Sequence, residues 1–249
     1  MKTQFGQAWD LLFHPPVAHR GLWSPDGAPE NSLAAFQLAC EAGYGIELDV
    51  HLSADGEAVV HHDYSLKRMT GQDGRIADHT AADLGNMKLK GTDEGIPTLL
   101  ETLALIGHRA MVHVELKTPF GQVGPLEQRV HEVLIDHNGP VCVIGFNPYS
   151  HAWFAEKFPG VLRGLDSYAW ADEAPYLSRE QRESFARLEQ VSIARPHFLA
   201  MSTDMVMAPK VAAYREQGMP VVAWTVRDPA IWETLKPHCD NLIFEGFKA

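Results

Sequence analysis

Residues 32–51, SLAAFQLACEAGYGIELDVH, decide the fold. Ser32 can cap a helix that begins there, and Gly43 suits the C-terminal end of that helix, so the pattern predicts a helix over residues 32–42. From residue 45 to residue 51 apolar and polar side chains alternate, which predicts a strand because successive side chains of a strand face opposite sides. A helix followed at once by a strand is the unit from which parallel sheets are built.

The same unit recurs along the chain, without repeats or low-complexity tracts. Predicted strands cover residues 16–19, 45–51, 58–62, 110–116, 141–145, 161–165, 197–201, 220–226 and 240–244. Predicted helices cover residues 32–42, 98–106, 124–137, 150–158, 178–189, 208–217 and 229–236. About eight strand–helix units in a chain of 249 residues are what a (β/α)8 TIM barrel, an α/β fold, requires. The alternative is a doubly wound open sheet. No G-x-G-x-x-G motif follows an early strand, which argues against a dinucleotide-binding version of that sheet.

Residues 63–97 interrupt this alternation with five glycines and many polar residues. They follow the second-strand region and precede the predicted strand at 110–116. We therefore expect residues 1–249 to form a single barrel domain in which residues 63–97 are an insertion at the catalytic face, where the loops after the strands lie.

The composition bears on partners and location. The formal net charge is −11, which argues against nucleic acid because such binding depends on lysine and arginine neutralising phosphates. These features carry no information on the oligomeric state. The three cysteines are far apart without C-x-x-C spacing, which favours reduced thiols and a cytoplasmic location. The start of the chain, MKTQFGQAWDLLFHPP, is too short and too polar for a signal sequence or membrane span, and we interpret it as an amphipathic cap.

Two predicted strands carry acidic side chains on one face. Glu47 and Asp49 lie two residues apart and therefore point to the same side. His113, Glu115 and Lys117 share a face in the same way. Carboxylates side by side would repel one another unless a cation lies between them or one of them holds a proton. Three carboxylates from two neighbouring strands make an oxygen-rich site that suits Mg²⁺ or Ca²⁺. The alternative is a pair of surface strands with alternating polarity.

Histidines stand at the ends of two other predicted strands. In His19-Arg20-Gly21 the glycine permits a sharp turn, the arginine can hold a phosphate with two hydrogen bonds, and the histidine can act as acid or base. His61 and His62 are adjacent, so only one of them can point into a site. The parity of the strand does not decide which, and a purely structural role for His19 also stays open.

Six motifs stand in the order that glycerophosphodiester phosphodiesterases show, and the sequence resembles that family from about residue 17 to residue 226. Each motif is short, but six of them in order are specific. The motifs are His19-Arg20-Gly21, Pro29-Glu30-Asn31-Ser32, Glu47-Leu48-Asp49, His62-Asp63, Glu115-Leu116-Lys117 and Ala223-Trp224-Thr225-Val226.

The resemblance implies a (β/α)8 barrel that binds one divalent cation, Mg²⁺ or Ca²⁺. Its implied ligands are Glu47, Asp49 and Glu115. The resemblance also implies that His19 and His62, rather than the neighbouring histidine, are the acid–base pair.

Further roles follow from the same resemblance. Arg20 and Lys117 are implied to contact the phosphate, and Trp224 to line the glycerol side. Glu30 is expected near the metal, and His113 is expected next to the metal ligands without binding the metal itself.

The chain also departs from the family pattern. The family usually ends its last strand with an Ile-Thr-Asp-x-Pro type of segment, whereas residues 243–247 read IFEGF, so that Glu245 stands in place of the aspartate. Residues 145–148, GFNP, match the family only loosely. Residues 63–97 occupy the place of the family's small inserted module.

The function implied is metal-dependent hydrolysis of glycerophosphodiesters to glycerol 3-phosphate and an alcohol, by histidine general acid–base catalysis. The nucleophile is water or the neighbouring glycerol hydroxyl. One alternative is a hydrolase of lysophospholipids or other lipid-like phosphodiesters. The other is a catalytically silent binding barrel. A lyase or aldolase on the same barrel would leave the two histidines without a role.

Overall fold

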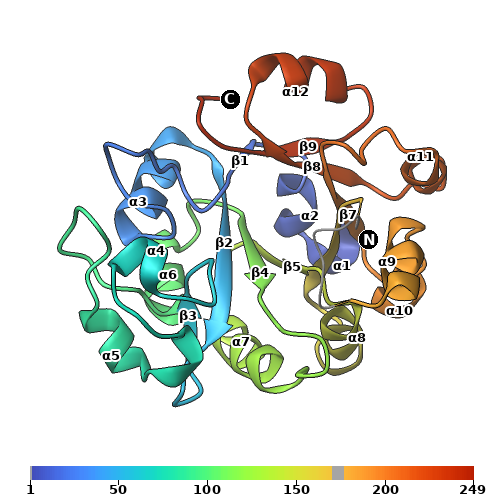
Figure 1. The fold of residues 1–249 in the computed structure, drawn as a ribbon. Helices are drawn as coiled ribbons and strands as arrows, with labels where there is room; N and C mark the ends of the chain where they lie inside the picture. The colour runs from blue at the N-terminus through green and yellow to red at the C-terminus, as the bar shows by residue number, and fades with distance from the viewer. Residues whose placement is uncertain (1, 170–176) are drawn as a thin grey trace.

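The computed structural model describes residues 2–169 and 177–249. Eight parallel strands form a closed barrel, because the first strand pairs with both the second and the last (Figure 1). The predicted (β/α)8 architecture is therefore confirmed. The barrel strands are β1 (Val17–Ala18), β2 (Gly45–Leu52), β4 (Val112–Leu116), β5 (Val141–Gly145), β6 (Leu162–Ser167), β7 (Phe198–Ser202), β8 (Val221–Val226) and β9 (Asn241–Phe244).

A further strand, β3 (Ala58–Val60), pairs only with β2 and runs antiparallel to it, with Val50 opposite Val60. The segment predicted as a strand at 58–62 is thus one arm of a hairpin and not part of the barrel wall. The reason is the length of the connection, because residues 53–57 are too few for the crossover that parallel strands require.

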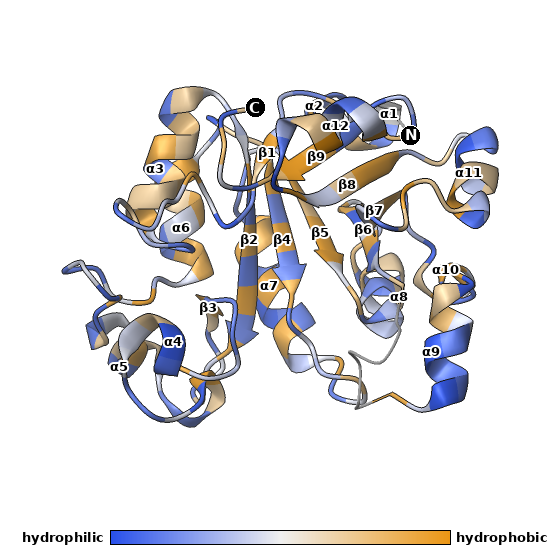
Figure 2. Cartoon of the chain, turned by 45° about the horizontal axis from the view of Figure 1, so that its top comes forward, coloured by the Kyte–Doolittle hydropathy of each residue, from blue (hydrophilic) through white to orange (hydrophobic). Residues whose placement is uncertain are grey.

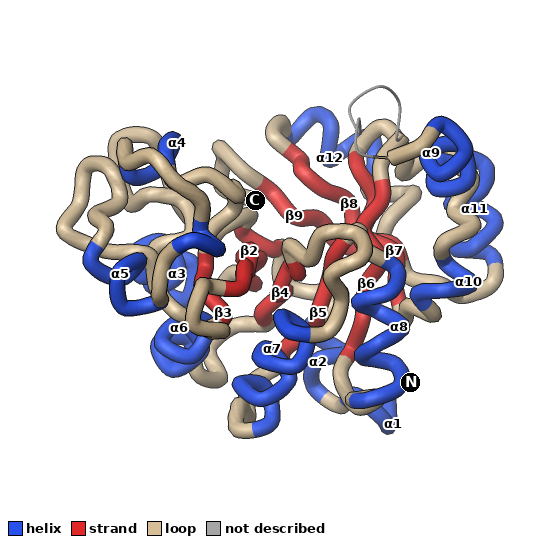
Figure 3. Tube along the Cα trace, turned by 60° about the horizontal axis from the view of Figure 1, so that its bottom comes forward, coloured by secondary structure: helices blue, strands red, loops and turns tan. Residues whose placement is uncertain are grey.

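Helices cover the outside of the strands (Figure 3). The helix predicted at 178–189 is present but ends earlier, at Ala186, because Leu188 adopts a left-handed conformation with φ 57°. A separate short helix begins at Val191. In the described part of the chain, none of the helices has the length and hydropathy that crossing a bilayer needs. The helices are α1 (Lys2–Phe5), α2 (Gln7–Leu11), α3 (Leu33–Ala42), α4 (Lys67–Thr70), η1 (Ile76–Asp78), α5 (Ala81–Asn86), α6 (Leu99–Ile106), α7 (Pro125–Ile135), α8 (Pro148–Lys157), α9 (Arg179–Ala186), α10 (Val191–Ala194), α11 (Pro209–Glu216) and α12 (Pro229–Leu235).

Helices α1 and α2 cover the end of the barrel at which the strands begin. Phe5 and Leu12 are buried in the same apolar cluster as Phe198, which comes from the barrel wall. The side chain of Asn241 donates hydrogen bonds to the carbonyl groups of Leu12 and Pro15, at 3.0 and 2.9 Å. The start of the chain therefore closes this end, and the carboxyl ends of the strands remain for a site.

The two faces of β2 have opposite character, as its alternating colours in Figure 2 show. Ile46 and Leu48 are buried in the apolar layer that includes Phe36 of α3. Glu47 and Asp49, at the alternate positions, face the barrel interior and are also buried. This alternation determines which face of β2 points into the barrel, because the apolar face is buried against the helices.

The elements α4, η1 and α5 follow β3 and lie to one side of the barrel (Figure 3). They bury an apolar cluster of their own that includes Leu66, Ile76, Leu84 and Ile96. Arg68 of α4 returns toward the barrel and pairs with Glu30. The segment thus has a separate small core and a polar connection to the barrel.

The barrel interior is closely filled where β6 passes β7. Gly164 lies opposite Phe198 in the register, and a Cβ atom added to this glycine would lie 2.2 Å from the Phe198 ring. Real Cβ contacts are never that short, so the ring occupies the space that any side chain at this position would need.

We predict that Gly164→Ala lowers the free energy of unfolding by about 1–3 kcal/mol, because it overpacks the interior. Phe198→Leu alone should also destabilise, by loss of packing. The double variant should lose about 1 kcal/mol less unfolding free energy than the sum of the two single losses, since the smaller side chain at position 198 makes room for the new methyl group. Denaturant unfolding measures all three.

The control is Gly160→Ala, since this exposed glycine has no atom within 4 Å of an added Cβ. Additive effects of Gly164→Ala and Phe198→Leu would contradict the steric explanation.

Candidate active site

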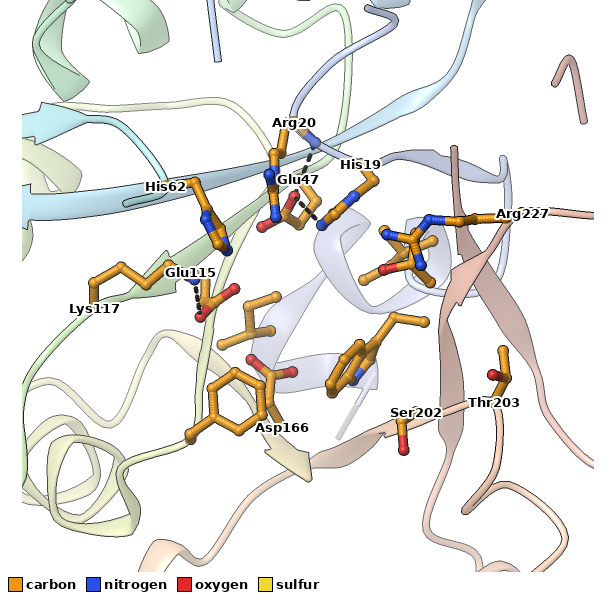
Figure 4. A pocket seen from close by; sticks show the side chains of 15 residues that line it. His19, Arg20, Glu47, His62, Glu115, Lys117, Asp166, Ser202, Thr203 and Arg227 are labelled. Atoms are coloured by element: carbon orange, nitrogen blue, oxygen red, sulfur yellow. Dashed lines mark hydrogen bonds and ion pairs between the residues drawn. The ribbon is translucent and has the colours of Figure 1, made fainter. Parts of the chain in front are cut away.

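A cavity of about 310 Å³ lies at the carboxyl ends of the strands. It contains both predicted histidines, both predicted phosphate-binding cations, two of the predicted metal ligands and Trp224 (Figure 4). The third predicted ligand, Asp49, is fully buried beside them. The fold thus brings together residues that lie more than 200 positions apart in the sequence.

Glu47, Asp49 and Glu115 form one buried acidic cluster. Asp49 lies opposite Glu115 in the pairing of β2 with β4, and one oxygen from each of the three residues lies within 4.8 Å of the others. Burial, together with the two neighbouring carboxylates, raises the pKa of Glu47 well above its usual range, and burial raises the pKa of Glu115 to about 7. Glu47 Oε1 is buried and has no hydrogen-bond partner in the described part of the chain. Such an oxygen set fits a hard divalent cation.

Two cations from the chain itself already lie against this cluster. Lys117 Nζ is 2.8 Å from Asp49 Oδ1 and 2.7 Å from Glu115 Oε1, and Arg20 Nε is 3.5 Å from Asp49 Oδ2. Burial acts to raise the pKa of Asp49, but Lys117, followed by His62 and Arg20, holds it well below its usual range. Asp49 is therefore ionised, and the positive charges of Lys117 and Arg20 lie directly against the buried carboxylates.

The turn after β1 positions Arg20. Its backbone has φ 58°, and Gly21 follows with φ 82°, so that the backbone N–H of Arg20 donates to Glu47 Oε2 at 2.9 Å. A Cβ on Gly21 would lie 2.9 Å from the backbone of Ala35, which only glycine avoids. Arg20 also donates from its guanidinium to Glu30 Oε1 at 2.8 Å, and this bond fixes the direction of the side chain.

Both histidines of the cavity are oriented by a carboxylate. His19 Nδ1 is 2.5 Å from Glu245 Oε2, and His62 Nδ1 is 2.7 Å from Asp63 Oδ1. Because a carboxylate accepts the hydrogen bond, the Nδ1 atom of each ring carries the proton and Nε2 is left for chemistry. His19 Nε2 lies 3.9 Å from Glu47 Oε2, at the edge of the acidic cluster.

The lining of the cavity does not include Glu30, His113 or the alternative histidine, His61. His61 does not line the cavity; its Nδ1 bonds the carbonyl group of Asp63 at 2.8 Å. Glu30 lies outside the acidic cluster, where it holds the guanidinium groups of Arg20 and Arg68. His113 is buried deeper in the barrel, its ring 6.1 Å from that of Phe198, and neither ring nitrogen has a hydrogen-bond partner among residues 2–169 and 177–249.

The comparison with known proteins agrees with this geometry. The model of the glycerophosphoryl diester phosphodiesterase family matches residues 19–138. A glycerophosphodiester phosphodiesterase of Caldanaerobacter subterraneus subsp. tengcongensis is 35% identical over 238 residues, which are 91% of this chain and 92% of that protein. The chain belongs to the glycerophosphodiester phosphodiesterase family. The predicted enzyme class, a phosphoric diester hydrolase, is thereby confirmed.

Solved structures of this family share the architecture. A phosphodiesterase from Oleispira antarctica, in complex with the product sn-glycerol-3-phosphate, superposes with a TM-score of 0.81 at 26% identity and covers 95% of this chain and 94% of its own. A glycerophosphodiester phosphodiesterase from Thermotoga maritima superposes with a TM-score of 0.72 at 30% identity and covers 93% of this chain and 94% of its own.

Several polar residues of this phosphodiesterase barrel are absent from the sequence-based prediction of the site. Asp166 and Arg227 line the cavity, and Arg68 holds Asp63 with a contact of 2.6 Å. Asp166 has the inward parity of Gly164 on β6, but the predicted strand ended one residue before it. Glu245, noted only as a departure from the family pattern, is the carboxylate that orients His19.

The electrostatics of the family site give a prediction for the metal-free protein. Burial, followed by the charge of Lys117, lowers the pKa of His62 to about 4. Lys117→Met should therefore raise the pKa of His62 toward its ordinary value of about 6.5, because a positive neighbour no longer opposes protonation. NMR titration of the imidazole signals in the presence of a chelator measures the change.

Lys210→Met is the matched control, since this residue lies on α11, away from the cavity. A His62 pKa that does not respond to Lys117→Met would show that the lysine does not govern it.

Proposed function

We propose that the chain hydrolyses glycerophosphodiesters to glycerol 3-phosphate and an alcohol in a metal-dependent reaction, with His19 and His62 as the acid–base pair. The observation that carries this proposal is the geometry of one cavity. Two histidines with free Nε2 atoms border an acidic cluster that can hold a cation, and Arg20 and Lys117 lie against the same cluster. The product named for the Oleispira antarctica relative supports glycerol 3-phosphate as the product here.

Binding of the phosphodiester rests on the two cations and on the metal site. We propose that Glu47, Asp49 and Glu115 hold one Mg²⁺ or Ca²⁺. When bound, this ion supplies Lewis-acid stabilisation of negative charge on the phosphate. Arg20 and Lys117 stabilise the charge that grows on the phosphoryl oxygens in the transition state.

Proton transfer falls to the histidines. Nε2 of one histidine accepts the proton of the nucleophile, whose oxygen forms a new bond to phosphorus. The P–O bond to the leaving alcohol breaks, and the other histidine, in its protonated form, gives a proton to that alkoxide. Glu245 and Asp63 hold the two rings in the required tautomer, which makes them positioning residues in this scheme.

Two nucleophiles are compatible with this arrangement. Attack by water gives glycerol 3-phosphate at once, whereas attack by the neighbouring glycerol hydroxyl gives a five-membered cyclic phosphate that water then opens. The ³¹P NMR spectrum during turnover distinguishes them, because only the second route passes through a cyclic species.

A second substrate class has support from a groove beside the cavity. Tyr64, Pro119, Phe120 and Phe146 line a space of about 520 Å³ next to Lys117, and these apolar surfaces would accommodate the chain of a lysophospholipid. Parallel assays with glycerophosphocholine and lysophosphatidylcholine, which both release choline, decide whether the glycerol side of the substrate can carry an acyl chain.

Three further properties belong to the proposal. We propose that residues 1–249 act as one domain and that residues 63–97 are its insertion at the catalytic face, supported by the contact of Arg68 with Asp63, next to His62. We propose a cytoplasmic location, supported by the three cysteines, all of which are free thiols. Trp224 lines the glycerol side of the cavity in this scheme.

The central test is release of glycerol 3-phosphate from glycerophosphocholine. EDTA should abolish activity and Mg²⁺ or Ca²⁺ should restore it. His19→Ala should lower kcat by a factor of roughly 10² to 10⁴, the usual contribution of a general acid or base. The exposed His238 offers the matched control, because His238→Ala lies outside the cavity and should leave the rate unchanged.

Activity that EDTA does not reduce, or an unimpaired His19→Ala enzyme, would overturn this scheme. Isothermal titration with Mg²⁺ and Ca²⁺ completes the test. Binding of an ion that Glu115→Gln weakens, without turnover of any glycerophosphodiester, would identify a silent binding barrel instead.

A further inference from the structure

Asp166 is a buried carboxyl group that the catalytic scheme does not use. It projects from β6 into the cavity and is only 2% exposed. Within residues 2–169 and 177–249, neither of its oxygens has a hydrogen-bond partner. A buried carboxyl group without a partner is strongly unfavourable, whether it is ionised or protonated. The chain therefore leaves this group to be satisfied by something that enters the cavity.

The surroundings of Asp166 differ from those of the acidic cluster. Ile144, Phe146 and Trp224 also line the cavity, and the rings of Phe146 and Trp224 meet edge to face with their centroids 5.5 Å apart. The indole Nε1 of Trp224 is also buried and has no acceptor in the described chain. One end of the cavity thus presents one unpaired donor and one unpaired acidic group between apolar walls.

This combination selects the chemistry of the ligand group. A phosphate would be repelled by Asp166 if that group is ionised, and it already has two cations at the other end of the cavity. A quaternary ammonium group could lie near a carboxylate and aromatic rings, but it has no acceptor for the indole N–H. A hydroxyl group accepts one hydrogen bond and donates another, so its chemistry is complementary to both the indole donor of Trp224 and the carboxyl group of Asp166.

We propose that Asp166, together with Trp224 Nε1, binds a hydroxyl group of the glycerol moiety and makes the enzyme select hydroxyl-bearing phosphate esters. The proposal rests on the proposed function for the identity of the moiety. In this role Asp166 is a specificity-determining residue and takes no part in proton transfer at phosphorus.

The test compares two ligands that differ only in their hydroxyl groups, sn-glycerol 3-phosphate and propyl phosphate. Their dissociation constants are measured by isothermal titration at a fixed Mg²⁺ concentration, so the test does not depend on turnover. Asp166→Leu, which removes hydrogen bonding at similar size, should weaken binding of glycerol 3-phosphate by roughly 10- to 100-fold. Its effect on propyl phosphate should be smaller by at least about tenfold, because that ligand never used the carboxyl group.

Two more variants make the test specific. Trp224→Phe keeps an aromatic ring but removes the N–H, and it should reduce the preference for glycerol 3-phosphate in the same direction. Asp166→Asn keeps the shape and some hydrogen bonding, so it should have an intermediate effect; it also replaces the leucine variant if that variant does not fold. The matched control is Asp136→Asn, at the exposed C-terminal end of α7, which should bind both ligands as the unaltered chain does.

Three outcomes would overturn the proposal. Equal weakening of both ligands by Asp166→Leu would show that the residue does not recognise the hydroxyl groups. Loss of Mg²⁺ affinity in that variant would make Asp166 a metal ligand. An unchanged ratio of the two dissociation constants would show that Asp166 does not contact the hydroxyl group. Failure of the proposed function looks different, since the unaltered chain would then release no glycerol 3-phosphate from glycerophosphocholine, whatever the variants bind.

Discussion

The burial of three carboxylates within 4.8 Å of one another is the constraint on which the rest of the structure depends. Like charges at this distance in the interior of a barrel are strongly unfavourable unless opposite charges or hydrogen-bond donors compensate them. The chain supplies Lys117 at 2.7 and 2.8 Å, the backbone N–H of Arg20 at 2.9 Å and the amide of Asn31 at 2.8 Å. Each of these groups comes from the carboxyl end of a strand or from the loop after it. The acidic cluster therefore determines what the loops must provide.

Compensation extends beyond the cluster as a chain of ion pairs. Asp49 contacts Arg20, which pairs with Glu30, and Glu30 also binds Arg68 of the segment after β3. Arg68 in turn holds Asp63, the residue that orients His62. A continuous path of charges thus connects the acidic cluster, the turn after β1, helix α4 and one of the two histidines. This gives the segment 63–97 a physical connection to the site that its glycine-rich sequence does not reveal.

Much of the fold and part of the site could be read from the sequence, and the reason is periodicity. Short runs rich in strand-forming residues located the nine strands of the described chain, and a period-two pattern gave the shared face of Glu47 and Asp49, because strand geometry is local. Parity could not choose between His61 and His62, since that choice depends on how the hairpin of β2 and β3 turns. The sequence did not place Asp166 in the site, because its strand extends past the last apolar residue. It did not predict the left-handed conformation of Leu188, because a left-handed residue inside a helical pattern has no compositional signature. These features are decided by contacts between distant segments, which a single sequence does not show.

The two ends of the cavity satisfy their polar groups by different means, and this difference limits what can bind. At the acidic cluster the chain opposes each carboxylate with a cation or a donor, and a divalent ion fits beside Glu47 Oε1, which has no hydrogen-bond partner in the described chain. At the other end, Asp166 and the indole nitrogen of Trp224 have no partner in the described chain, and apolar side chains surround them. A ligand that is complementary to both ends must carry negative charge on one side and neutral hydrogen-bonding groups on the other. The net charge of −11 restricts anion binding further, because anions are favoured only at the few positions where the chain concentrates lysine and arginine.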